Sequence, residues 1–208
     1  MKVNCHDKGI KKAVEIIENG GVIIFPTDTV YGIGCNPYDV NAVKKIYEIK
    51  SREKIKSLPV LESSIQIVKQ ISIIDEFTEK IIKKYWPGPL TLILKLKDKN
   101  LKKSLNLEDK IAVRIPNSVC TLKLLNKCNL LVGTSANVSG DSSFTNPQEC
   151  MKNVKNYDVF VDGGTITSKG ESTIIEIENE KIHIIREGAL KKEDIVIWWI
   201  WLLPVQEI

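Results

Sequence analysis

Side chains that could bind a polyanion gather in three short segments of this sequence. Two threonines, an aspartate and a tyrosine follow the apolar run 22–25 within the segment 26–34 (PTDTVYGIG). Four cations lie within seven residues of the segment 50–59 (KSREKIKSLP), and hydroxyls and a carboxamide occur in the segment 134–140 (TSANVSG). Arginine offers a planar fork for phosphate or carboxylate, lysine a compact charge, and hydroxyl and amide groups can bind phosphate oxygens. These residue types predict a phosphate-binding site.

Each of these segments also has a purely structural interpretation. A basic run can be a solvated surface, and a loop rich in Ser and Asn can be a turn held by bonds from side chains to the backbone. The position of 50–59, one predicted helix after 26–34, favours a shared crevice, because ligands bind at the carboxyl ends of strands in open α/β sheets. We therefore expect 26–34 to be a polar loop and not a packed strand.

Two arginines lie in or beside apolar runs. Arg114 is inside the run 111–116 (IAVRIP), where an unpaired buried cation is costly. It therefore requires an anionic ligand or an ion-pair partner, unless the alternation of the strand turns it to solvent. Arg186 follows the run 181–185, and the segment 171–173 (EST) adds two hydroxyls.

The sequence lacks the motifs of several common catalytic units. Its two histidines, His6 and His183, are interpreted as structural or surface residues. No Gly-x-x-x-x-Gly-Lys-Ser/Thr loop occurs, and Gly32 and Gly34 lack the third glycine of a dinucleotide-binding motif. Catalysis would then rest on orienting reactants and neutralising their charge, without a nucleophilic side chain.

The elements that position these residues follow from apolar periodicity. The pattern predicts helices at 10–17, 39–47, 63–70 and 75–85 and strands at 22–25, 58–61, 91–96, 111–115, 130–132, 157–161, 174–177 and 181–185. Asp39 is a candidate N-cap, the segment 86–89 (WPGP) must end a helix, and Asn179-Glu180 indicates a hairpin. Because no strict βαβ rhythm occurs, we expect an α/β (α+β) fold with a mixed sheet flanked by helices, in one domain over 1–188.

Composition and charge indicate an ordinary globular protein. The chain has 208 residues, 43% of them hydrophobic, and its 30 basic against 26 acidic residues give a net charge of +4. This excess is smaller than that of a dedicated nucleic-acid binder. Five cysteines without a Cys-x-x-Cys pair predict reduced thiols with no disulfide framework or zinc site. The amino terminus has no apolar signal core, so we expect a cytoplasmic protein.

The segment 189–208 is expected to be a short apolar tail. Three of the four tryptophans lie within 195–205, an apolar run too short for the ~20 residues of a membrane span. No stable membrane insertion is therefore expected. Docking on the domain, self-association and contact with a membrane interface all stay open.

Six motifs occur in the order found in the YrdC-like family of threonylcarbamoyl-AMP synthases, which the sequence resembles from about residue 8 to residue 190. They are FPTDTVYG at 25–32, KSR at 50–52, WPGPLT at 86–91, VRIP at 113–116, TSANVSG at 134–140 and REG at 186–188. The resemblance implies a twisted open mixed sheet with a large basic cavity.

The resemblance also implies a reaction. L-threonine, bicarbonate and ATP would give L-threonylcarbamoyl-AMP and pyrophosphate, with Mg²⁺ held mainly by the ATP phosphates. The product would feed the threonylcarbamoyl modification of an adenosine in tRNA. Proteins that transfer the threonylcarbamoyl group to tRNA, and tRNA itself, are therefore implied partners.

Site residues carry over from the family motifs to matching positions of this sequence. Catalytic roles are implied for Lys50, Arg52, Ser135 and Asn137. Threonine binding is implied for Thr29, Tyr31 and Thr173. ATP binding is assigned to Lys50, Arg52, Lys56, Arg114, Ser135, Asn137, Ser143 and Arg186. Asp28 is interpreted as a residue that orders the loop or lies near the metal, and is not counted as catalytic.

Three positions depart from the family pattern. Glu53 and Ser57 stand where prolines are common, and Leu61 stands where many members have histidine. These changes bear on substrate affinity more than on reaction class. Two alternatives remain: a related carbamoyl-adenylate transferase, as in hydrogenase maturation, whose extra modules have no room here, and a noncatalytic module of the same fold that binds double-stranded RNA or tRNA.

Overall fold

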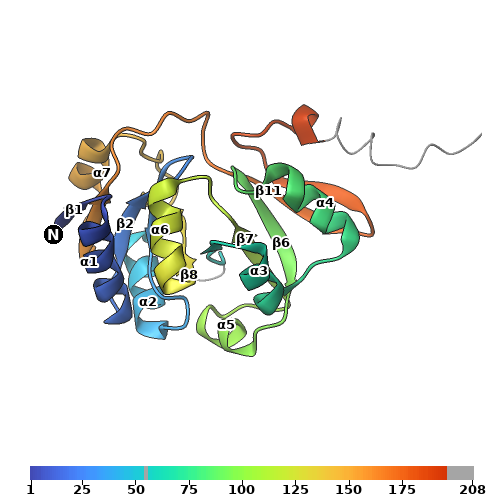
Figure 1. The fold of residues 1–208 in the computed structure, drawn as a ribbon, viewed down its shortest axis with the longest axis horizontal. Helices are drawn as coiled ribbons and strands as arrows, with labels where there is room; N and C mark the ends of the chain where they lie inside the picture. Colours follow the sequence, from blue (N-terminus) through green and yellow to red (C-terminus); the bar gives the residue numbers. More distant parts are fainter. Residues whose placement is uncertain (54–55, 196–208) are drawn as a thin grey trace, which may run out of the picture.

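The structure is a computed structural model that describes residues 1–53 and 56–195. It has the mixed α/β architecture that the sequence predicts, with two open sheets flanked by helices (Figure 1). The helices are α1 (Asp7–Glu18), α2 (Val40–Ile49), α3 (Ile65–Ile71), α4 (Glu76–Tyr85), α5 (Lys99–Ser104), α6 (Val119–Cys128) and α7 (Pro147–Asn153). The strands are β1 (Lys2–Asn4), β2 (Ile23–Pro26), β3 (Tyr31–Gly34), β4 (Val60–Glu62), β5 (Ser72–Ile73), β6 (Leu90–Leu96), β7 (Lys110–Arg114), β8 (Leu130–Val132), β9 (Thr134–Ser135), β10 (Val159–Asp162), β11 (Thr173–Glu178) and β12 (Lys181–Arg186).

The first sheet has the strand order β1-β10-β2-β3-β9. Its first three strands run parallel, and β3 is antiparallel to both of its neighbours. Successive side chains of a strand point to opposite faces. Accordingly, Ile23 and Phe25 of β2 pack in a cluster with apolar residues of α1 and α6, whereas Ile24 joins the larger cluster that includes α2. Helices therefore cover both faces of this sheet.

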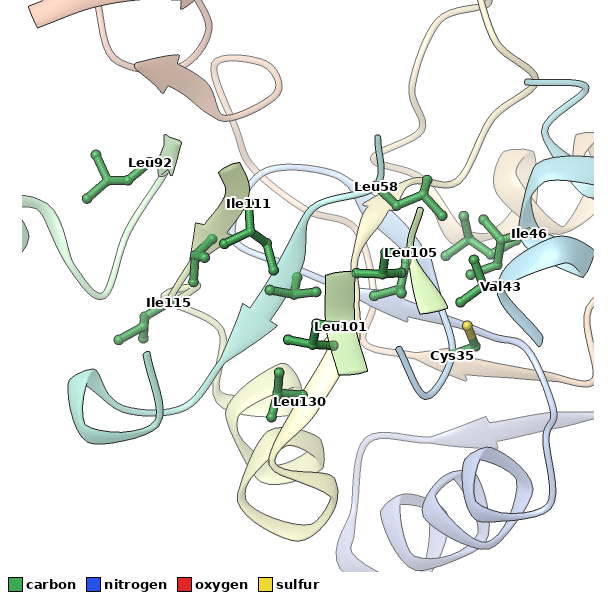
Figure 2. Packing of buried hydrophobic residues seen from close by; sticks show 14 of the residues in the cluster. Cys35, Val43, Ile46, Leu58, Leu92, Leu101, Leu105, Ile111, Ile115 and Leu130 are labelled. Carbon is green, nitrogen blue, oxygen red and sulfur yellow. The ribbon is translucent and has the colours of Figure 1, made fainter. Parts of the chain in front are cut away.

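The second sheet has the strand order β12-β11-β6-β7-β4-β8, with β5 paired to β6. Parallel pairs (β11 with β6, β7 with β4) alternate with antiparallel ones. The larger apolar cluster contains residues of both sheets and packs the two sheets together. Figure 2 shows Val43 and Ile46 of α2 at one end of this cluster and Leu92 of β6 at the other, with Leu101 and Leu105 between them.

Helix ends follow the predicted chemistry. Asp39 caps α2, because its carboxylate accepts hydrogen bonds from the backbone N–H groups of Asn41 and Ala42 at 2.9 and 3.0 Å. Helix α4 ends at Tyr85, directly before the segment 86–89. The hairpin between β11 and β12 also forms as predicted, and Asn179 and Glu180 adopt positive φ angles in its turn.

The expectation that 26–34 is a polar loop is wrong for its ends. Pro26 is the last residue of β2, and Tyr31–Gly34 form β3, a buried strand antiparallel to β2. Gly34 explains how this strand packs, because a Cβ there would lie 1.9 Å from the Val132 carbonyl oxygen. The glycine thus allows a close approach between two strands. The loop is limited to residues 27–30.

The expectation of five reduced thiols is also corrected. Cys5 and Cys120 form a disulfide, with their Cα atoms 5.7 Å apart, while Cys35, Cys128 and Cys150 are free. The two partners are 115 positions apart in sequence, and only the packing of α6 beside the β1–α1 junction brings them together.

No helix among residues 1–53 and 56–195 is long and apolar enough to cross a membrane. Residues 196–208, which hold the tryptophans of the expected tail, lie outside the described residues, and the role of the tail stays a prediction.

Candidate functional site

A pocket of about 330 Å³ is lined by residues of both sheets. The first sheet contributes the 27–30 turn, Gly32 and the two residues of β9, and the second sheet contributes residues of β4, β6, β7, β11 and β12. Five of the lining residues are charged: Arg52, Lys56, Arg114, Glu171 and Arg186. The pocket therefore has an excess of positive charge, which suits an anionic ligand.

The 27–30 turn is built around one hydroxyl. The Thr27 Oγ1 donates to the Val30 carbonyl at 2.7 Å and accepts from the backbone N–H of Thr29 at 3.0 Å. The Oγ1 atoms of Thr27 and Thr29 lie 3.0 Å apart. Both residues line the pocket, and Thr29 is 1% exposed. The turn thus holds its hydroxyls in a fixed arrangement.

Arg114 at the end of β7 joins the two sheets. Its Nη1 donates to Thr29 Oγ1 at 3.0 Å, its Nη2 forms an ion pair with Asp28, and its Nε donates to the Gly88 carbonyl at 2.9 Å. Burial lowers the pKa of Arg114, and the charge of Asp28 opposes that change. The alternatives left open by the sequence are thereby settled: Arg114 is buried and has an ion-pair partner.

Lys50 lies behind the pocket wall, outside the lining residues, and is 1% exposed. Its Nζ donates to the carbonyls of Ser135 and Asn137, the latter at 2.9 Å, and to Asn137 Oδ1 at 3.1 Å. Burial, and then the nearby charge of Arg52, lowers the pKa of Lys50 to about 8. The ammonium group therefore fixes the 135–137 segment and presents Ser135 to the pocket.

Arg52 and Lys56 lie at the pocket wall itself. The Arg52 Nε donates to the Lys56 carbonyl at 3.1 Å, and its Nη2 donates to the Ser57 carbonyl at 3.0 Å. Lys56 is exposed and lies 3.8 Å from the Glu53 carboxylate. Arg52 is thus bonded to the backbone just before β4, and it still lines the pocket.

Arg186 at the end of β12 is anchored to the two residues directly before β11. Its Nε and Nη2 donate to the Ser172 carbonyl at 3.2 and 2.8 Å, and Nη2 also lies 3.2 Å from Ser172 Oγ. Its Nη1 forms an ion pair with Glu171. Ser172 Oγ in turn accepts from Thr91 Oγ1 at 2.9 Å. The part of the pocket around Arg186 therefore combines a cation, a carboxylate and two hydroxyls.

The structure thus brings together Thr29, Arg52, Lys56, Arg114, Ser135 and Arg186 around one pocket. The other predicted site residues lie outside its lining: Lys50, Tyr31, Asn137, Ser143 and Thr173.

Three of these outer residues have hydroxyl or amide groups bonded within the protein. The Tyr31 hydroxyl donates to the Gly164 carbonyl at 2.7 Å, and the Asn137 Nδ2 donates to the Asp141 carbonyl at 2.6 Å. The Thr173 Oγ1 donates to the Leu190 carbonyl at 2.6 Å and accepts from two backbone N–H groups. Their contacts in this structure hold loops and the segment after β12.

Six polar lining residues had no site role assigned from the sequence: Thr27, Ser57, Thr91, Thr134, Glu171 and Ser172. Period-two alternation could have found Ser172. Because neighbouring side chains of a strand face opposite sides, Ser172 and Ile174 face the pocket while Thr173 points away. Thr91 lies in the WPGPLT motif, but nothing in the motif shows that its side chain meets that of Ser172.

The described residues include no group of three or more His, Cys, Asp and Glu side chains that could hold a metal ion. Mg²⁺ commonly binds through one or two carboxylates together with substrate phosphates. The carboxylates at this pocket, Glu171 and the nearby Asp28, are each paired with an arginine. The donor set thus fits an ion that arrives with a polyphosphate better than one held by the protein alone.

Comparisons with known proteins match this chain to one protein family. The family model Sua5_yciO_yrdC, described as "Telomere recombination", matches residues 15–188. A Methanocaldococcus jannaschii protein, named provisionally as a threonylcarbamoyl-AMP synthase, is 38% identical over 185 residues, which are 86% of this chain and 87% of that protein.

Two further matches involve Pyrococcus abyssi. Its threonylcarbamoyl-AMP synthase is 33% identical over 189 residues, which are 89% of this chain but 56% of that protein. The crystal structure of P. abyssi Sua5 complexed with L-threonine superposes with a TM-score of 0.88 at 32% identity and covers 94% of this chain and 59% of that one. The chain therefore spans little more than half the length of the P. abyssi protein.

Proposed function

The chain belongs to the Sua5/YciO/YrdC family, and from this premise we propose that it is a threonylcarbamoyl-AMP synthase, a nucleotidyltransferase. The substrates would be L-threonine, bicarbonate and ATP, and the products threonylcarbamoyl-AMP and pyrophosphate. The proposal rests on the pocket lined by both sheets, which combines hydroxyls held by hydrogen bonds with three arginines and a lysine.

The proposed reaction needs several anions in one place. The amine of threonine attacks the carbon of bicarbonate, water leaves, and a carbamate forms. A carbamate oxygen then attacks the α-phosphorus of ATP, the bond to the β-phosphate breaks, and pyrophosphate leaves. Cations held in position lower the cost of bringing these anions together, and orientation of the reactants supplies a further part of the acceleration.

Under this proposal, some pocket residues contact the triphosphate and others contact threonine. Arg52, Lys56 and Arg186 would contact the triphosphate, since they line the pocket and carry its charge. Thr29 would contact threonine, with its Oγ1 held in place by Arg114. Support for a threonine-binding role comes from the threonine complex of the related P. abyssi Sua5.

Four residues outside the pocket lining would act by positioning. Lys50 and Asn137 hold the segment that presents Ser135 to the pocket. Thr173 and Tyr31 hold the elements that flank the pocket. Mg²⁺ would be held by the ATP phosphates, where it neutralises charge on the triphosphate. The product would serve threonylcarbamoyl modification of tRNA, in a cytoplasmic setting.

An assay of substrate dependence tests the proposal. The full chain would be incubated with ATP, Mg²⁺, bicarbonate and one amino acid at a time, and released pyrophosphate and trapped carbamoyl-adenylate would be measured. We expect release with threonine, and loss of release when bicarbonate is omitted. Release that is independent of both, or RNA binding with no nucleotide turnover in any mixture, would refute the proposal.

A further inference from the structure

One carboxylate lies in a pocket that otherwise carries positive charge. Glu171 lines this pocket and forms an ion pair with Nη1 of Arg186. Its negative charge also acts on two other cations: burial lowers the pKa of Lys50 and of Arg52, and Glu171 opposes that change in both. The carboxylate therefore lies within electrostatic reach of Arg52, which lines the pocket, and of Lys50 behind the pocket wall.

Arg186 does not depend on this carboxylate for its position. Its Nε and Nη2 donate to the Ser172 carbonyl at 3.2 and 2.8 Å, which fixes the plane of the guanidinium. Glu171 takes the Nη1 side instead. That side is the part of the guanidinium fork left for an incoming anion, because the other donors are directed at Ser172, directly before β11.

We propose that Glu171 is an internal competitor for Arg186, whose carboxylate occupies the Nη1 side when the pocket holds no phosphate and weakens the hold of the pocket on pyrophosphate. The inference rests on the proposed function, in which pyrophosphate is a product. Four cations around one small pocket would otherwise retain a polyanion strongly. Glu171 returns to Arg186 as pyrophosphate leaves, so the ion pair replaces the contact that release breaks.

Direct binding of inorganic pyrophosphate tests this inference without any need for turnover. Calorimetric titrations in a metal-free buffer would compare the full chain with Glu171→Gln and with Glu187→Gln. The control removes the same charge from a residue outside the pocket lining that pairs with Lys191. We expect Glu171→Gln to lower the Kd for pyrophosphate about tenfold, and Glu187→Gln to leave it unchanged.

Several outcomes would overturn the inference. A Kd that is unchanged or higher in Glu171→Gln would mean that the carboxylate does not compete for Arg186. If none of the three proteins bound pyrophosphate detectably, the inference would also be overturned. Thermal unfolding checks that the variant is folded, and Glu171→Ala replaces it if it is not. Tighter binding in a protein without threonine-dependent turnover would leave the competition intact and refute the proposed function alone.

Discussion

Two cations of the segment 50–52 have different surroundings. Lys50 is buried, and its ammonium group donates to three oxygen atoms of Ser135 and Asn137. Arg52 donates to two carbonyls of its own loop and still lines the pocket. Lysine is thus used as a compact charge that organises backbone carbonyls, and arginine as a fork that keeps one side for other partners.

The Arg52→Ala variant should lose turnover without losing the fold. We expect threonine-dependent pyrophosphate release to fall by roughly 100-fold or more, because a fixed cation at the triphosphate is removed. The residue lies in a loop and is partly exposed, so the unfolding temperature should change little. Steady-state rates and thermal unfolding measure the two effects.

Two further variants serve as comparisons. Lys103→Ala removes an exposed cation of α5 that lies outside the pocket and should keep its activity. Arg52→Lys should recover part of the rate, since a single charge replaces the fork. A folded Arg52→Ala variant with normal activity would contradict the assigned role.

Single residues of the site were predictable where the sequence showed that burying a charge would cost free energy. An arginine inside an apolar run demands a partner, and Arg114 has one in Asp28. The surroundings of Lys50 were not predictable, because its acceptors are 85 and 87 positions away. Nor was the pairing of Glu171 with Arg186, which depends on the register of β11 against β12.

At the scale of elements, strand β4 carries a buried acid. Glu62 is 0% exposed, and neither of its carboxylate oxygens has a hydrogen-bond partner. Burial raises its pKa to about 9, since a charged carboxylate is disfavoured away from water. The strand lies between β7 and β8, so the acid is enclosed in the sheet that supplies much of the pocket wall.

Glu62 should make stability depend on pH. The folded protein keeps this proton up to about pH 9, while the unfolded chain releases it near pH 4.5. Because the folded state binds more protons in this window, the free energy of unfolding should fall as the pH rises from 5 to 8. Over this window the contribution of this residue is on the order of 4 kcal/mol.

The Glu62→Met variant isolates this effect, because it removes the acid and keeps a similar volume. Urea unfolding at pH 5 and at pH 8 should show the variant gaining stability over the original chain at the higher pH. Glu48→Met, a change on an exposed face of α2, is the control and should show no such difference. Equal pH profiles for the Glu62→Met variant and the original chain would contradict the expectation.

Elements with strong local signals were predictable, and those that depend on distant partners were not. Helix α2 has an aspartate cap and an apolar face, and it forms where expected. Strand β3 was missed because Tyr31–Gly34 contains two glycines, and its formation depends on pairing with β2 and β9. Helices α5 and α7, with six and seven residues, are too short for a clear period.

At the scale of the whole molecule, the disulfide links the amino-terminal segment to α6. The same helix supports the pocket, because the Ser118 and Thr121 hydroxyls donate to the Pro26 carbonyl, directly before the 27–30 turn. Cys5 and Cys120 also belong to the apolar cluster beneath α1 and α6. A covalent bond and a packed cluster thus stabilise the same contact.

Loss of this bond should lower stability only under oxidising conditions. A disulfide stabilises mainly by restricting the unfolded chain, and one that spans 115 positions contributes on the order of 5 kcal/mol. We expect Cys120→Ser to unfold at a lower temperature than the original chain without reductant, and at a similar temperature with it. Cys128→Ser, which changes a free cysteine, is the control. An equal shift in both conditions would show that packing alone is responsible.

The bond between Cys5 and Cys120 also turns part of the chain into a covalent ring. The ring contains β2, β3, α2, β4, β6 and β7, and hence strands of both sheets. Strand β1 lies before this ring, and strands β8 to β12 leave it as a carboxyl-terminal tail that returns to pair with strands inside it. If a protease cut the peptide chain once within the ring, the two fragments would migrate as one species in gel electrophoresis until the disulfide is reduced.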